Sequence, residues 1–140
     1  MKHSLHKYFY YSLVSFLLQA KQQVVSVAGE FGLTGVQALT LLTIRNDMQR
    51  SMSDFCKLYE CDASNITGII DGLEQKDLVS RQPHSNDRRI KIIHLESAGI
   101  KLQKQLIERI AEVSPHLFAN LSLEETQELA RLIQKSQSVK

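Results

Sequence analysis

The stretch from Ser51 to Leu95 limits the fold of this 140-residue chain more than any other part of the sequence. Its first part, Asp54 to Tyr59, is predicted to form one or two helical turns that carry apolar side chains. A break follows at Glu60–Asp62, where Asp62 or Ser64 can cap a new helix. Beyond the break, apolar residues recur at the i, i+3, i+4, i+7 spacing of an amphipathic helix, at Ile66, Ile69, Ile70 and Leu73. Two helices joined by such a short turn predict a helix-turn-helix.

The second of these helices has a polar face made of short side chains, whereas a face that is only solvated favours Glu, Lys, Gln and Arg. Short polar groups and glycine let a helix approach base edges and phosphates in a major groove. Asn65 is the predicted base reader, because its amide can form two hydrogen bonds with adenine. Ser64 has a second interpretation, as the helix cap. The residues predicted to contact DNA from this helix are Ser64, Asn65, Thr67, Gly68 and Asp71.

A basic β-hairpin is predicted after the second helix. Leu78–Arg81 and Ile90–Leu95 are β-type runs, and the turn formers and basic groups of QPHSNDRR join them. Such a hairpin beside a recognition helix is a wing, whose tip can place a guanidinium in the electronegative minor groove. The net charge of the chain is only +2, so the basic character must be local. The charged or basic residues of the wing are Arg81, His84, Asp87, Arg88, Arg89 and Lys91.

In this order and at these spacings, the segment resembles the winged helix-turn-helix core of the MarR family, the multiple-antibiotic-resistance type of bacterial repressors. The resemblance extends, more weakly, over nearly the whole chain. It implies a dimeric transcription regulator that binds double-stranded DNA, a repressor relieved by a small-molecule effector. The residues that carry it are Ser53-Asp54-Phe55-Cys56, Ser64-x-x-Thr67, Asp71-x-Leu73-Glu74, Leu78-Val79-x-Arg81, Asp87-Arg88-Arg89 and Leu95-x-x-x-Gly99.

The resemblance also implies roles for charged residues in the wing. Asp87-x-Arg89 matches the family pattern in which the arginine enters the minor groove and the aspartate braces it. A carboxylate is suited to this task because it fixes the fork of a guanidinium. Arg88 is interpreted as solvated or facing a phosphate. Arg81 either pairs with Asp87 across the hairpin or contacts a phosphate. All four residues are therefore included in the predicted DNA-binding set.

Three positions depart from the family pattern. Many relatives have glycine where this chain has Glu60 and Asp77, and a left-handed backbone is costly for residues other than glycine. The local geometry at both positions is therefore an open question. Glu96 stands where threonine usually caps the helix after the wing, and Ser97 is predicted to take over that role.

Amphipathic helices are predicted on both sides of the winged module. Because one recognition helix reads only a few base pairs, we predict a homodimer on a pseudo-palindromic operator. The predicted helices outside the motif cover about Leu5–Glu30, about Thr34–Arg45, about Ser97–Val113 and a last segment opened by a capping box at Ser122–Glu125. The chain is thus predicted to be one mainly α domain with a small β-wing, in which residues 33–96 bind DNA and residues 1–32 and 97–140 form the dimerisation region.

Other classes of function have little support in the sequence. The chain lacks a phosphate-binding glycine-rich loop, an HExxH motif and a nucleophile elbow, so no enzyme and no catalytic residues are predicted. The histidine spacing fits no metal site, and no cofactor is expected. Neither a signal peptide nor a membrane span is recognisable, which predicts a cytoplasmic protein without membrane association.

Three alternatives to an effector-controlled regulator stay open. One is a winged-helix module that binds protein, which apolar groups exposed at the wing tip and helix face would favour. Another is a regulator that has no ligand. The third is a thiol switch, for which Cys61 is a better candidate than Cys56 because it directly precedes the recognition helix. Such a switch needs an exposed thiol with a lowered pKa. The sequence assigns no residues to an effector site.

Overall fold

The computed structural model describes residues 2–113 and 115–137, and this part of the chain is mainly helical with one small antiparallel sheet. The predicted fold class is therefore confirmed. In chain order the elements are α1 (Lys2–Ala28), the 3-10 helix η1 (Gly29–Phe31), α2 (Gly35–Thr43), α3 (Met52–Tyr59), α4 (Ala63–Glu74), β1 (Val79–Pro83), β2 (Lys91–Leu95), α5 (Ser97–Val113), the 3-10 helix η2 (Pro115–Leu117) and α6 (Leu123–Gln137).

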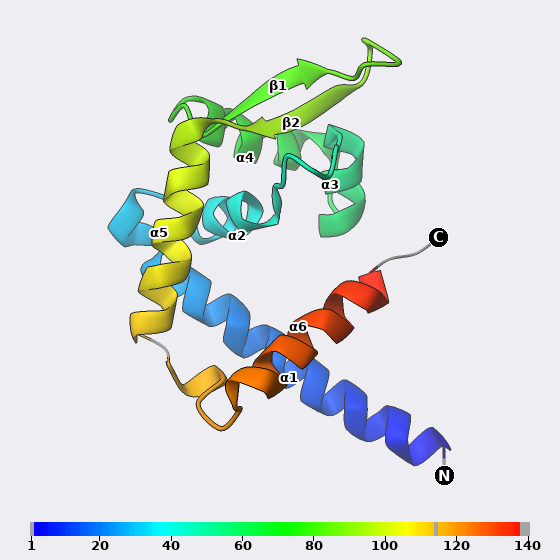
Figure 1. Cartoon of the computed structure of the whole chain (residues 1–140). Coiled ribbons are helices and arrows are strands. Elements are labelled where there is room, and N and C mark those ends of the chain that lie inside the picture. The colour runs from blue at the N-terminus through cyan, green and yellow to red at the C-terminus, as the bar shows by residue number, and fades with distance from the viewer. Residues whose placement is uncertain (1, 114, 138–140) are drawn as a thin grey trace.

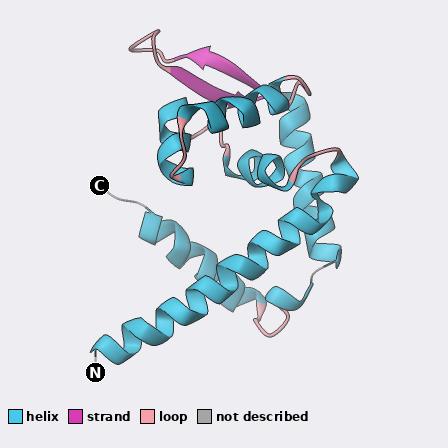
Figure 2. Cartoon of the chain, turned by 180° about the vertical axis from the view of Figure 1, so that it is seen from behind, coloured by secondary structure: helices cyan, strands magenta, loops and turns pink. Residues whose placement is uncertain are grey.

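Residues 33–96 form a compact unit, called the head below, from which α1 and α6 extend (Figure 1). The long helix α5 runs from the base of the wing to η2 and so joins the head to the region where α6 crosses α1. The reverse view shows the same crossing (Figure 2). The head spans the residues predicted to bind DNA, and the extended helices are those predicted to form the dimer.

The hydrophobic core lies mainly in the head, where α2, α3, α4 and the wing meet α5 and the end of α1. The inward stripe predicted for α4 is confirmed, because Ile66, Ile70 and Leu73 are fully buried and Ile69 packs against them. Phe55 gives α3 its buried anchor. The remaining buried apolar residues are Val27, Ala28, Leu33, Ala38, Leu41, Ile44, Leu78, Val79, Ile93, Leu95 and Leu106.

Side-chain amides fix the wing and α5 to the end of α2. Asn46 donates to the Leu95 carbonyl at 3.1 Å and accepts from the Leu95 N–H at 2.8 Å. The Gln103 amide on α5 donates to the carbonyls of Leu41 and Ile44 at 2.6 and 2.8 Å, at the end of α2. The wing therefore has a defined attachment to the helices beneath it.

The close approach of α5 to the wing depends on a glycine. A Cβ added to Gly99 would lie 2.0 Å from the backbone oxygen of Leu78, a distance that no side chain tolerates. The Glu96 N–H donates to the same oxygen at 3.0 Å. Glycine at position 99 thus allows α5 to begin directly against the first residues of the wing.

Most predicted caps are present, and one prediction was wrong. Thr34 caps α2, and Ser122 exchanges hydrogen bonds of 2.8 and 3.2 Å with Glu125 at the start of α6. Ser97 does not cap α5. The Ile100 N–H donates to the Glu96 carbonyl, so Glu96 occupies the cap position and Ser97 is already helical. The Glu96 carboxylate instead accepts from the Ser80 hydroxyl at 2.5 Å.

Glu60 and Asp77 both adopt the left-handed conformation, with φ of 48° and 55°. Glu60 ends α3, and its N–H donates to the carbonyls of Cys56 and Lys57. Asp77 lies in the turn between α4 and β1, where its N–H donates to the Glu74 carbonyl at 2.9 Å. Both turns are thus formed by acidic residues in a conformation that favours glycine.

The first half of α1 exposes many apolar side chains. Tyr8 and Leu18, for example, are 74% and 62% exposed, whereas the last turn of α1 is buried at Val27 and Ala28. The spacing of Leu129, Leu132 and Ile133 predicts a buried face of α6, yet Leu132 and Ile133 are 46% and 41% exposed in the single chain. Within the described residues no single helix is long and apolar enough to span a membrane, although the bent pair His6–Phe31 and Gly35–Thr43 meets the length and composition criteria together.

Candidate nucleic-acid interface

The first turn of α4 is organised by Asp62. Its carboxylate accepts from the Asn65 N–H at 3.0 Å and from the Ser64 hydroxyl at 2.8 Å. These hydrogen bonds hold the pKa of Asp62 below its usual value. Asp62 is therefore the helix cap that the sequence left open between Asp62 and Ser64. The Ser64 hydroxyl supports this cap from within the helix.

The polar face of α4 is open to solvent. Ser64, Asn65, Thr67 and Gly68 are all exposed, and Asp71 is half-buried. The Thr67 hydroxyl donates to the Ala63 carbonyl at 2.7 Å, which leaves its oxygen free to accept a hydrogen bond. A Cβ at Gly68 would meet no other atom within 4 Å. Internal packing therefore does not require glycine at position 68, in contrast to Gly99.

The wing is the β1–β2 hairpin with the loop between its strands. Val79 pairs with Leu95 at its base and Pro83 with Lys91 near its tip. The base is held by the core, because Val79, Ile93 and Leu95 are buried. In Figure 1 the tip projects away from the helices of the head. A third segment joins the sheet at one point, where Ser51 bridges to Ile92.

Arg89 at the wing tip is held by Asp87. Its Nε and Nη2 donate to the two carboxylate oxygens of Asp87, each at 3.0 Å, and its backbone N–H donates to Oδ1 at the same distance. These contacts hold the pKa of Asp87 below its usual value and raise the pKa of Arg89. The Arg89 side chain is nevertheless 90% exposed. The brace implied by the family resemblance is present, and the guanidinium it holds faces solvent.

Arg81 lies elsewhere. Its guanidinium contacts the carboxylates of Glu74 and Asp71 on α4, and its side chain is only 22% exposed. The predicted pairing of Arg81 with Asp87 was therefore wrong. The two remaining basic groups at the tip differ in exposure. Arg88 is exposed, whereas His84 is half-buried and accepts a hydrogen bond from the Asn86 N–H through Nδ1 at 3.0 Å.

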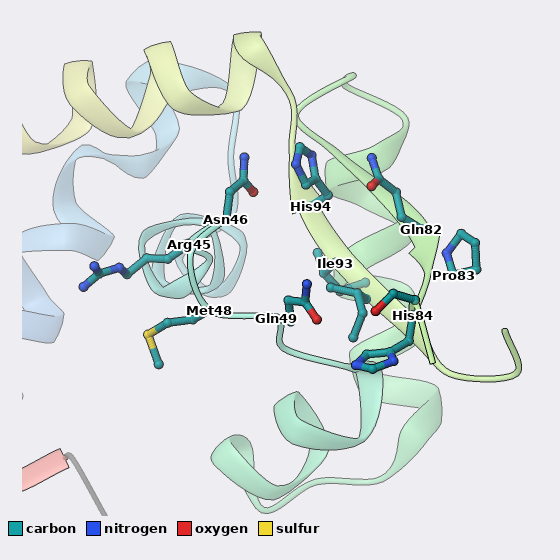
Figure 3. Close-up of a pocket in the computed structure, with 11 residues that line it drawn as sticks. Arg45, Asn46, Met48, Gln49, Gln82, Pro83, His84, Ile93 and His94 are labelled. Carbon is teal, nitrogen blue, oxygen red and sulfur yellow. The ribbon is translucent and has the colours of Figure 1, made fainter. Parts of the chain in front are cut away.

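A cavity of about 170 Å³ with polar and apolar lining lies between the wing and the loop after α2 (Figure 3). Its polar lining comes from Arg45, Gln49, Gln82, His84 and His94. The Nδ1 atom of His94 is buried and has no hydrogen-bond partner among the described residues. The cavity therefore lies between two segments of the head, and both segments contribute side chains that can form hydrogen bonds with a small molecule.

The cysteines do not have the character of sensor thiols. Cys56 and Cys61 are both half-buried. Burial raises the pKa of the Cys61 thiol, and the neighbouring Cys56 adds to the rise. A raised pKa disfavours the reactive thiolate. Among the described residues, no group of three or more His, Cys, Asp or Glu side chains is placed to hold a metal ion.

Sequence reasoning missed two residues that position this surface. Glu74 was recognised only as part of a family motif, yet it contacts Arg81 through both the side chain and the backbone. Asn46 lies in a polar connection and gave no periodic signal, yet it holds both backbone groups of Leu95. Both contacts join residues of different elements, so they depend on how the wing strands pack against α4 and against the loop after α2.

The comparisons with known proteins agree with this geometry. The model described as the MarR family matches residues 33–91. NicR from Pseudomonas putida, named an HTH-type transcriptional repressor, is 28% identical over 103 residues, which are 74% of this chain and 65% of NicR. YpoP from Bacillus subtilis, named an uncharacterized HTH-type transcriptional regulator, is 31% identical over 96 residues, 68% of this chain and 66% of YpoP. The matches thus span about two thirds of the length of these relatives.

A solved structure has the same fold. The crystal structure of a mutant MarR from Escherichia coli in complex with operator DNA aligns with a TM-score of 0.61 at 23% sequence identity. The alignment covers 90% of this chain and 91% of that chain. The likeness therefore extends beyond the head to α1, α5 and α6.

Proposed function

This chain belongs to the MarR family, and from that membership we propose that it is a homodimeric repressor of transcription that binds double-stranded DNA in a sequence-specific way. The observation that carries the proposal is the pairing of two exposed features on the head. One is the short polar face of α4, and the other is the braced guanidinium of Arg89 at the wing tip.

The face of α4 supports insertion into the major groove. Its exposed side chains are short, so the helix axis can come close to the base pairs. The open space around Gly68 supports the same contact, because the backbone there is uncovered. We assign base reading to Asn65 and backbone contacts to Ser64 and Thr67. Asp71 is shared with Arg81 and lies at the edge of this face.

The wing supports a second contact, in the minor groove. Asp87 fixes the Arg89 fork without covering it, so little side-chain entropy remains to be lost on binding. A narrow minor groove has an enhanced negative potential that attracts such a cation. We assign Arg88 to a phosphate, because it is exposed on the same loop.

A second copy of the chain would complete the DNA-binding surface. One recognition helix contacts only a few base pairs, whereas two helices related by a two-fold axis read half-sites about one helical turn apart. The exposed apolar residues of α1 and α6 support this assembly, since contact with another copy would bury them.

We further propose that a small molecule relieves repression. The cavity behind the wing supports this proposal, because a ligand there would touch both wing strands and the loop after α2 (Figure 3). Arg45, Gln49 and Gln82 in its lining offer such a ligand hydrogen-bonding groups. A compound that releases bound DNA from this cavity should lose its effect in His94→Phe, which places a larger, apolar ring there.

A protein-binding module is the second candidate function. It would need apolar groups on the α4 face and the wing tip. Among the described residues of the wing loop and strands, Ile90 is the large apolar side chain that is exposed, at 42%. A single exposed aliphatic residue is ordinary on a protein surface. The basic and short polar groups around it favour nucleic acid.

The experiment that tests the proposal is selection of bound duplexes from a random pool, followed by anisotropy titration. We expect a two-fold symmetric site, and Asn65→Ala should weaken binding to it by about 1–3 kcal/mol. The matched control is Asn120→Ala, an exposed asparagine in the turn before α6, which should bind as the wild type does. Failure to enrich any site, or equal affinity of both variants, would contradict the proposal.

A further inference from the structure

Arg81 joins the wing to the recognition helix through three contacts. Its Nη2 donates to Asp71 Oδ1 at 2.5 Å, and its Nη1 contacts the Glu74 carboxylate. Its backbone N–H also donates to Glu74 Oε1, at 3.3 Å. Glu74 therefore binds both the main chain and the side chain of Arg81, and Asp71 binds the other arm of the same guanidinium.

These contacts secure one edge of the hairpin. Arg81 and Ile93 face each other in the β1–β2 register, yet their backbone N–H groups bond outward. The Ile93 N–H donates to the Arg50 carbonyl, and the Arg81 N–H donates to Glu74. The wing is thus tied on one side to the segment before α3 and on the other side to the end of α4. Its angle to α4 depends on both ties.

The same contacts neutralise negative charge beside the proposed DNA surface. Asp71 and Glu74 are 48% and 39% exposed, on a helix whose neighbouring residues are assigned to base and phosphate contacts. Two unpaired carboxylates next to these contacts would repel the phosphates of bound DNA. The Arg81 guanidinium contacts both, and two of its nitrogens are occupied by these carboxylates rather than open to a phosphate.

We propose that Arg81 is a positioning residue for DNA binding and not a phosphate contact. It sets the wing against α4 and cancels the charge of Asp71 and Glu74, so that recognition helix and wing tip engage DNA together. This inference rests on the proposed function, because it explains how one DNA-binding surface is held. It reassigns a residue that the sequence placed among the direct contacts.

The test compares variants on the duplex selected for the wild type, over a series of salt concentrations. Arg81→Gln should bind about tenfold more weakly, within the range of couplings in salt-bridge networks. The loss of affinity should shrink as salt rises, because salt screens the repulsion between the two unpaired carboxylates and the phosphates. Adding Glu74→Gln to Arg81→Gln should restore part of the affinity, since one of the two unpaired charges is then removed. Arg88→Gln is the matched control and should lower the salt slope by about 1.

A second measurement tests the contact between Glu74 and the Arg81 backbone in the absence of DNA. Hydrogen exchange of the Arg81 amide should be faster in Glu74→Ala than in the wild type, because that amide loses its acceptor. Thermal unfolding of each variant separates this local effect from loss of fold. If Arg81→Gln does not fold, Arg81→Lys takes its place, since it keeps the charge but cannot bridge two carboxylates. It should weaken binding without changing the salt slope.

Two outcomes would overturn the proposal, and they are distinguishable. A salt slope that falls by about 1 in Arg81→Gln, with no rescue by Glu74→Gln, would make Arg81 a phosphate contact and leave the proposed function intact. A wild type that binds no duplex specifically would overturn the proposed function and this inference together.

Discussion

Arg89 and Asp87 form the best-defined charged pair at the wing tip, with two side-chain hydrogen bonds of 3.0 Å. The Arg89 guanidinium lowers the pKa of Asp87 in the folded chain. A carboxyl whose pKa is lowered by folding adds stability above its unfolded pKa and loses it as the pH falls through the folded value. The brace is therefore complete at neutral pH and is released only in acid.

Replacing Arg89 should damage DNA binding more than replacing its neighbour. Arg89→Ala should lose about 1–3 kcal/mol of binding free energy, because it removes the braced cation proposed to enter the minor groove. Arg88→Ala removes an equal charge one residue away and should cost less than Arg89→Ala. Fluorescence anisotropy on the selected duplex measures both. Equal losses would mean that the two arginines serve only as general positive charge.

Sequence reasoning found the Asp87–Arg89 pair but not the partners of Arg81. The first pair is local, since one position separates its residues in a tight turn. Their contact therefore does not depend on the rest of the fold. Arg81 had several carboxylates within reach. The choice of Glu74 and Asp71 depends on the register of the hairpin, which directs the Arg81 N–H toward α4. Residue patterns alone do not determine this direction.

At the scale of elements, the turn between α3 and α4 sets the geometry of the helix-turn-helix. Glu60 closes α3 with φ of 48° and ψ of 40°. The N–H of Cys61 then donates to the Cys56 carbonyl at 3.2 Å, which completes the turn. A left-handed residue is needed here for α4 to start at the required angle, and glutamate bears the steric cost that glycine avoids.

Glycine at this turn should stabilise the protein. Glu60→Gly is expected to raise the free energy of unfolding by about 1 kcal/mol, because the left-handed strain is relieved. Asp77→Gly, at the other left-handed position, should gain less, since aspartate tolerates this conformation better. Urea unfolding measures both.

The matched control for this substitution lies in a regular helix. Glu108→Gly, in the interior of α5, should lower the free energy of unfolding by about 1 kcal/mol, because glycine weakens the helix and the exposed Lys104–Glu108 ion pair is lost. A Glu60→Gly variant that loses stability as this control does would show that the Glu60 side chain contributes more than its backbone costs.

Element boundaries were predicted well where a physical signal marks them. Thr34 and the Ser122–Glu125 pair carry capping chemistry, and the helix predicted over Ser97–Val113 has those bounds. The cap of α5 was predicted wrongly, because Ser97 is a good cap by residue type but Glu96 holds that position. The Ser51–Ile92 bridge was not visible, since a single pairing has no periodicity.

At the scale of the whole molecule, exposed apolar residues on α1 and α6 predict a dimer. Leu18 is 62% exposed in the single chain. Leu18→Glu should shift the protein from dimer to monomer in sedimentation velocity, because an interface does not accept an unpaired carboxylate. Leu58→Glu is the control, since Leu58 is 52% exposed but lies on α3 in the head. A wild type that sediments as a monomer would contradict this prediction.

The outer helices could be predicted as amphipathic, but not what their apolar faces contact. The periodic stripe of α1 is buried at Val27 and exposed at Phe9 and Leu17. Part of the stripe therefore packs within the chain, and the rest is available to another copy. Sequence periodicity shows that a face is apolar. Whether a given turn of that face is buried within the chain or exposed depends on where the helix leaves the head.

The measurement that tests sequence-specific DNA binding most directly compares two duplexes across salt concentrations. One is the selected duplex, and the other has the same bases in scrambled order. We predict that the wild-type protein prefers the selected duplex by at least about 10³-fold at physiological salt, and that two chains bind each duplex. Affinities that are equal for both duplexes and vanish together as salt rises would leave only attraction to phosphates, and would contradict sequence-specific recognition.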